Sequence, residues 1–155
     1  MALATPRNIV GYEEVDSCDV TYKIDNSTIA YDATKANGAA TTMIGKAVTL
    51  SADDTVALAA DGDMVLGKLI SVEADNKCSV RIGGYVTLPG GNGATLTRGK
   101  KIVGALNGSS EKGYIRDVTA ATGSFVQGTI NEMQKARHCI QNTGTTTAVG
   151  VLLDC

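Results

Sequence analysis

The chain has 155 residues, of which 18 are glycine, one is phenylalanine and none is tryptophan, and its formal net charge at pH 7 is −2. This length suffices for one domain that buries about two thirds of its unfolded surface, around a core of mostly small aliphatic side chains. The small net charge, with no basic run interleaved with aromatic residues, argues against a nucleic-acid partner. No apolar run approaches the about 20 residues of a membrane helix, and residues 1–14 lack a secretory signal pattern, so we expect a cytosol-like compartment.

Residues 1–44 are predicted to form an extended arm that becomes ordered by lying on another surface. Residues 1–45 carry three Lys or Arg residues against six acidic residues, whereas residues 46–155 carry eleven against ten. Alternating apolar residues allow one hairpin within residues 20–31, and the small, polar stretch 33–42 reads as a linker. Deletion of the arm is therefore expected to leave the remaining β-domain, residues 45–155, intact.

Residues 45–93 are predicted to form successive short strands separated by tight polar turns. Apolar residues alternate with polar or small residues in four runs, at 47–51, 56–58, 64–72 and 80–88. Such period-two patterning, with a turn about every 8–12 residues, is typical of a small closed barrel or sandwich. We therefore expect a mainly β fold, which more often serves as a scaffold for contacts than as a catalyst.

The remaining residues continue the strand pattern. Two strand pairs are predicted, residues 101–106 with 114–118 and residues 136–141 with 146–153. The second pair is expected to turn at Asn142-Thr143-Gly144, and its last strand is nearly all apolar, so it should lie inside a sheet. Residues 129–137 are predicted to form the one short helix, which needs packing because isolated helices of this length are marginal in water.

The chain contains no recognisable catalytic motif. His138, its only histidine, precedes Cys139, but neighbouring side chains on a strand point to opposite faces, so a thiol–imidazole pair is not expected. His138 is interpreted as a surface or half-buried residue. The four cysteines lie far apart without a C-x-x-C pair, which predicts free thiols. We therefore expect no enzyme and no catalytic residue.

Candidate sites for metals and phosphates are explained better as turns. The aspartates at 53, 54, 61 and 63 lack the alternating ligands and the closing glutamate of a calcium loop. The glycine-rich segments 83–85 and 89–93 are followed neither by Lys-Ser or Lys-Thr nor by a predicted helix, unlike a phosphate loop. No cofactor-binding or metal-binding residue is expected. Arg98, Lys100 and Lys101 form a small basic cluster, either a solvated turn or a patch for an acidic protein surface.

The strand-rich part of the chain resembles a known family. The residues that carry the resemblance are GKAVTLSADDTVALAADGDMVLGKLISVE at 45–73, CSVRIGGYVTLPGG at 78–91, TRGKKIVGAL at 97–106 and the apolar ending VGVLLD at 149–154. In their order and texture these strands are similar to the small β-rich decoration (cement) proteins of tailed-bacteriophage capsids. The resemblance covers about residues 45–155.

The resemblance implies a small β-tulip or barrel-like domain with an extended N-terminal arm, bound to the outer surface of an expanded phage head. Such a protein assembles in the host cytoplasm, becomes part of the virion as a trimer or dimer, and clamps neighbouring major capsid subunits against internal DNA pressure. No cofactor, nucleic acid or membrane is implied. The candidate capsid contacts are Arg7, Asn8, Ile9 and Tyr12 in the arm, and Arg98, Lys100 and Lys101.

Two alternatives stay open. One is another structural part of the virion, such as a head-fibre or tail adaptor, for which the sequence shows no long trimeric extension or receptor-binding tip. The other is a small β-barrel enzyme or ligand-binding module, which would need a cavity with convergent polar groups. The few aromatic residues and the single histidine argue against it.

Overall fold

The computed structural model describes residues 17–40, 42–94, 96–118, 131, 133–136, 138–145 and 148–153. Their strands are β1 (Asp19–Ile24), β2 (Ala47–Ala52), β3 (Thr55–Leu58), β4 (Gly67–Val72), β5 (Lys77–Arg81), β6 (Gly84–Leu88), β7 (Ile102–Ala105), β8 (Tyr114–Asp117), β9 (Cys139–Thr145) and β10 (Ala148–Leu153). Asn131 and Met133–Lys135 are helical, within the predicted short helix. The fold is therefore mainly β, which confirms the predicted class.

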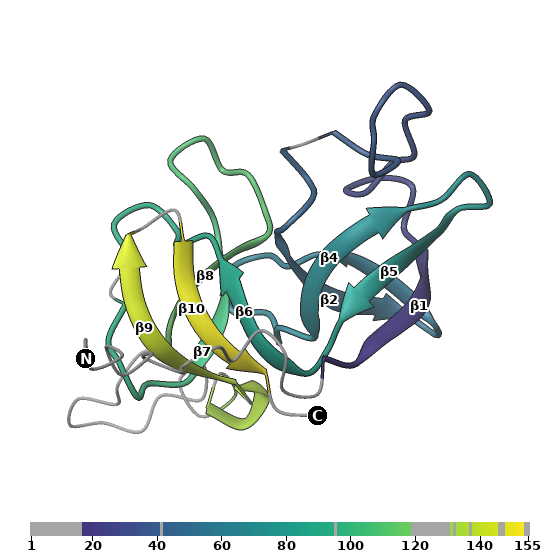
Figure 1. Cartoon of the computed structure of the whole chain (residues 1–155). Helices are drawn as coiled ribbons and strands as arrows, with labels where there is room; N and C mark the ends of the chain where they lie inside the picture. The colour runs from purple at the N-terminus through teal and green to yellow at the C-terminus, as the bar shows by residue number, and fades with distance from the viewer. Residues whose placement is uncertain are drawn as a thin grey trace, which may run out of the picture.

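The first five strands form a closed barrel in the order β1-β3-β2-β4-β5 (Figure 1). β1 runs antiparallel to β5 from the pair Asp19↔Arg81 to the pair Lys23↔Lys77, and parallel to β3 at its end. The barrel encloses one of the two hydrophobic clusters, whose members include Ile24, Val48, Val56, Leu69 and Val80. These side chains are small and aliphatic, as the composition predicts.

The arm predicted over residues 1–44 is wrong for residues 17–40, because β1 is a strand of the barrel and the loop after it contributes Ile29 and Ala39 to the barrel core. β1 pairs with the distant β5, not with a neighbouring strand, so the local hairpin expected within residues 20–31 is also wrong. After β1 the Asp25 carboxylate accepts the backbone N–H groups of Thr28 and Ile29, both at 2.9 Å, and this turn directs Ile29 into the core. Residues 1–16 of the predicted arm lie outside the described residues.

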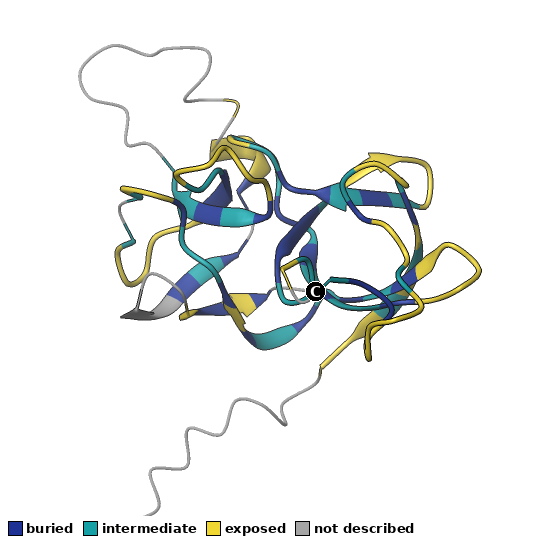
Figure 2. Ribbon diagram, turned by 90° about the horizontal axis from the view of Figure 1, so that it is seen from above, coloured by how far each residue is buried: buried dark blue, intermediate teal, exposed yellow. Residues whose placement is uncertain are grey.

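The last five strands form a second unit beside the barrel, with its own hydrophobic cluster (Figures 1 and 2). It contains a three-stranded sheet in the order β6-β10-β9 and a two-stranded sheet of β7 and β8. β10 is the central strand of its sheet, as its apolar sequence predicts. The turn predicted at residues 142–144 is wrong, because β9 continues to Thr145. The predicted run 80–88 divides after Arg81, where the chain passes from the barrel to β6.

The two units share a closely packed boundary. Ala47, Ala59 and Val65 come from the barrel part of the chain but belong to the second cluster. Gly104 of β7 approaches the barrel so closely that a Cβ there would lie 2.1 Å from the carbonyl oxygen of Ala60. This contact fixes how β7 and its following loop sit against the barrel.

Candidate functional site

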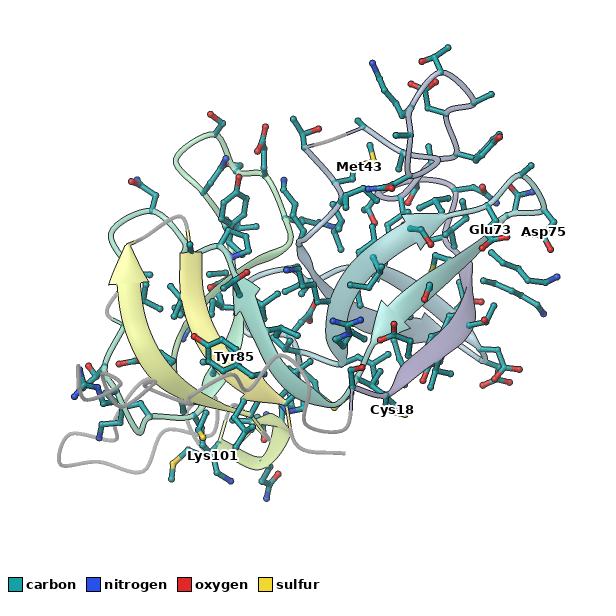
Figure 3. All side chains as sticks on the ribbon, viewed as in Figure 1. Cys18, Met43, Glu73, Asp75, Tyr85 and Lys101 are labelled. Atoms are coloured by element: carbon teal, nitrogen blue, oxygen red, sulfur yellow. The ribbon has the colours of Figure 1, made fainter. Side chains whose placement is uncertain are left out.

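The three predicted contact residues of the second unit lie in one exposed loop, residues 97–101, which we call the basic loop. Arg98, Lys100 and Lys101 are all exposed. Figure 3 shows Lys101 at one side of the molecule and the acidic residues Glu73 and Asp75 at the opposite side. The structure therefore brings together the predicted basic residues. The other predicted capsid contacts, Arg7, Asn8, Ile9 and Tyr12 of the arm, lie outside the described residues.

The backbone of the basic loop is held by hydrogen bonds to two other segments. Gly99 N–H donates to the carbonyl of Ile140 at 2.8 Å, and Ile140 N–H donates to the carbonyl of Lys100 at 3.0 Å. Thr97 N–H donates to both carboxylate oxygens of Asp117, at 3.1 and 3.0 Å. Gly99 has a φ of +80°, which a glycine adopts at little cost and other residues rarely do. The loop thus presents exposed, charged side chains from a backbone held by hydrogen bonds.

The cations of the basic loop take no part in the ion pairs found among the described residues. Those pairs are Lys46–Glu111, Lys77–Asp75, Arg81–Asp19 and Arg116–Asp61. In sequence, residues 17–82 contain six Lys or Arg and nine Asp or Glu residues, and residues 83–155 contain seven and four. The barrel segment is therefore net negative and the segment with the basic loop is net positive, although the whole chain carries only −2. The positive charge of the loop is available to an acidic partner.

An open cleft of about 760 Å³ lies beside the basic loop. Its lining includes Lys100, Asn107, Asp61 and Arg116. Arg116 Nε lies 2.8 Å from Asp61 Oδ1, so these opposite charges neutralise each other across the cleft. The paired charges give little reason to assign the cleft to a small-molecule ligand.

The residues weighed for catalysis occupy ordinary structural positions. His138 is only 2% exposed, so the prediction of a surface or half-buried histidine is wrong, and Cys139 beside it is half-buried. Cys18 and Cys78 are free thiols, the first exposed and the second buried. Burial raises the pKa of the Cys78 thiol to about 11, which keeps it protonated near neutral pH and therefore a poor nucleophile.

The aspartates weighed as calcium ligands form turns and pairs. Asp54 has a φ of +54° in the β2–β3 turn, and Asp63 Oδ2 accepts the N–H of Ala60 at 2.8 Å. Asp61 is the partner of Arg116. Within the described ranges, no three His, Cys, Asp or Glu residues are placed so that they could hold a metal ion together. Turn formation, as predicted, explains Asp54 and Asp63.

Sequence reasoning missed a second polar cluster, which we call the lysine cluster and which consists of Lys46, Asn107, Glu111 and Tyr114. Lys46 precedes β2 and is only 8% exposed, although lysine is rarely buried. Its partners all come from the β7–β8 hairpin of the second unit. The only signal in the sequence is the position of Lys46 directly before the apolar residues of β2, which does not reveal a partner about sixty positions away.

Comparisons of the chain with protein-family models, with curated proteins and with solved structures gave no match. Among the helical residues that the structure describes, no helix is long and apolar enough to span a membrane. The candidate function is therefore argued from the residues and the geometry of this chain.

Proposed function

We propose that this protein is a capsid decoration protein that binds the outer surface of an expanded phage head and clamps neighbouring major capsid subunits. In this role it has no enzymatic activity and resists the separation of subunits under internal DNA pressure. The proposal rests on the sequence resemblance of residues 45–155, and the mainly β fold of the chain is compatible with it. A fold of short strands and exposed loops suits a role based on surface contacts.

The observation that supports this proposal most is the basic loop. Arg98, Lys100 and Lys101 project from a backbone fixed by Ile140 and Asp117, and the described structure contains no acidic partner for them. A net positive surface on a net negative protein favours one orientation toward an acidic partner. We infer that this surface faces acidic residues of the capsid, while the opposite side, which carries Glu73 and Asp75, faces away from the shell.

Because many copies of the protein would bind one capsid, weak individual contacts can still give stable attachment. An exposed ion pair contributes about 0.2–1 kcal/mol, so one basic loop alone binds poorly. A trimer or dimer joins several loops, and the effective concentration of the second and third contacts then raises the overall affinity. Symmetric copies placed around a local symmetry axis would each contact a different capsid subunit, which is what clamping requires.

Charge reversal in the basic loop tests the proposed contact. We expect the double variant Lys100→Glu/Lys101→Glu to bind capsids about tenfold more weakly or worse at low salt, because two attractive contacts become repulsive. The difference from the wild type should shrink near 1 M salt, where the screening length is about 3 Å. Binding is measured by co-sedimentation with expanded capsids over a salt series.

The matched control is Lys23→Glu/Lys35→Glu, which reverses two exposed lysines of the barrel segment and changes the net charge equally. This control should bind nearly as the wild type does. An equal loss in both double variants, or a loss that does not depend on salt, would contradict a contact through the basic loop.

A further inference from the structure

The lysine cluster places the Glu111 carboxylate in contact with the Lys46 amine and with the Asn107 side-chain amide, at the boundary between the two units. The Lys46 side chain is 10% exposed, and its Nζ lies 3.4 Å from Glu111 Oε2 and 4.7 Å from the centre of the Tyr114 ring. Asn107 Nδ2 donates to the same Glu111 oxygen at 2.7 Å. One carboxylate oxygen therefore contacts both the Lys46 amine and the Asn107 amide nitrogen.

The carbonyl of the Asn107 side chain is polarised by the backbone. Its Oδ1 accepts two N–H groups, from Ser109 at 2.8 Å and from Glu111 at 2.9 Å. Paired backbone donors of this kind stabilise the negative charge that develops on a carbonyl oxygen when a nucleophile attacks its carbon. Asn107 Nδ2 also lies 3.2 Å from the Tyr114 hydroxyl, so its amide group is held on both sides.

The hairpin loop is held tightly over Lys46. Ala47 N–H donates to the carbonyl of Gly113 at 2.9 Å, and Gly113 N–H donates to the carbonyl of Ala59 at 2.7 Å. Gly113 has a φ of +89°, and a Cβ at this position would lie 2.7 Å from Lys46 Cβ. Glycine here lets the loop approach the Lys46 side chain closely.

We propose that Lys46 and Asn107 form an intramolecular isopeptide bond between Nζ and Cγ, with Glu111 transferring the protons. Attack of an amine on a primary amide requires a neutral amine, a base within hydrogen-bond reach, a polarised carbonyl and a route for the leaving nitrogen to gain a proton. In the lysine cluster Lys46 would supply the amine, Glu111 the base and proton carrier, and Asn107 the polarised carbonyl and the leaving nitrogen. The bond is independent of any capsid partner.

The proposed step is balanced without an oxidant or a cofactor. Glu111 takes one proton from the Lys46 ammonium, and the neutral Nζ attacks Asn107 Cγ, whose oxygen becomes negative between the two N–H donors. The Nζ–Cγ bond forms, and Glu111 carries a proton to Nδ2. The Cγ–Nδ2 bond then breaks, the carbonyl reforms, and nitrogen leaves as ammonia, which takes up the remaining proton as ammonium.

The reaction is expected to be slow at neutral pH and faster at higher pH. The positive charge of Lys46 holds the pKa of the Glu111 carboxyl below its usual value, so the resting state is the ion pair. Attack requires the amine to lose a proton first, so the reaction is expected to be slow.

Mass spectrometry of the purified full-length protein tests the proposal directly. After prolonged incubation at mildly alkaline pH, the measured mass of the denatured protein should be lower than the mass calculated from its sequence by the mass of one ammonia molecule. Peptide mapping should give a branched peptide that joins Lys46 to Asn107. A protein that keeps its full mass throughout the incubation would overturn the proposal.

Three variants assign the reaction to these residues. Lys46→Arg and Glu111→Gln should both keep the full mass, because one lacks the amine and the other lacks the base. The matched control Lys112→Arg, which changes an exposed lysine of the same loop, should lose ammonia as the wild type does. Crosslinking in Glu111→Gln at the wild-type rate would overturn the role of Glu111.

A cyclic imide at Asn107-Gly108 would also release one ammonia and must be distinguished. Such an imide forms from the backbone nitrogen of Gly108, so it would persist in Lys46→Arg and would be cleaved by hydroxylamine. An isopeptide bond resists hydroxylamine and disappears in Lys46→Arg. Ammonia loss that peptide mapping places at Asn107 and that survives in Lys46→Arg would therefore overturn the isopeptide assignment.

Discussion

Removal of residues 1–44 is expected to abolish cooperative folding, whereas removal of residues 1–16 is expected to leave it intact. The longer deletion removes β1, which closes the barrel between β3 and β5. It also removes Ile24 and Ile29, which are 4% and 0% exposed. Loss of one large buried aliphatic side chain costs about 2–5 kcal/mol. Loss of both is therefore comparable to the whole free energy of unfolding of a typical domain, about 5–15 kcal/mol.

Urea denaturation followed by far-UV circular dichroism measures both deletions. The 1–16 deletion should keep the wild-type midpoint and slope, and the 1–44 deletion should show no cooperative transition. If the 1–44 deletion folds and has the wild-type spectrum, the β-domain begins near residue 45, as the sequence predicts. This result would also show that β1 is dispensable to the barrel.

Gly38→Ala is expected to destabilise the protein by about 2–5 kcal/mol, the sum of a left-handed backbone penalty and a steric clash. Gly38 has a φ of +70°, and a Cβ there would lie 1.6 Å from the carbonyl oxygen of Val72. The backbone cannot move away easily, because Val72 N–H donates to the carbonyl of Asn37 at 2.8 Å. The loop after β1 and strand β4 would therefore separate.

Gly93→Ala is the matched control for this substitution. Its φ of +64° is similar, but no atom lies within 4 Å of the added Cβ. Only the backbone penalty of about 1–2 kcal/mol is expected there. Equal urea midpoints for the two variants would show that Gly38 does not pack against β4 as the structure has it.

The sequence predicts the local strands of this protein well, because most of them are bounded by turn residues that act locally. The strands β2, β3 and β4 lie within predicted runs in which apolar residues alternate with polar or small ones and which are separated by turn residues. The apolar run at 148–153 is the central strand β10. The pairing of β1 could not be predicted in this way, because its partner β5 lies more than fifty residues away. Long-range pairing depends on the whole barrel, which no local pattern reports.

The inward face of a strand was also harder to predict than the strand itself. In β4, Leu69 and Val72 are both buried although they are three positions apart, because a β-bulge between Leu69 and Ser71 shifts the alternation. The sequence likewise identified the basic residues of the candidate site but not the support of their loop by Ile140 and Asp117. It missed the lysine cluster altogether, because burial of Lys46 depends on a distant hairpin.

Co-sedimentation with expanded capsids that lack this protein tests the proposed function most directly. The proposal calls for expanded capsids of the phage that it assigns to this chain, and bound copies per shell are counted over a range of protein concentrations. We predict saturable binding at a stoichiometry that matches the local symmetry axes of the shell. Failure to bind intact expanded capsids at any concentration would contradict the decoration role.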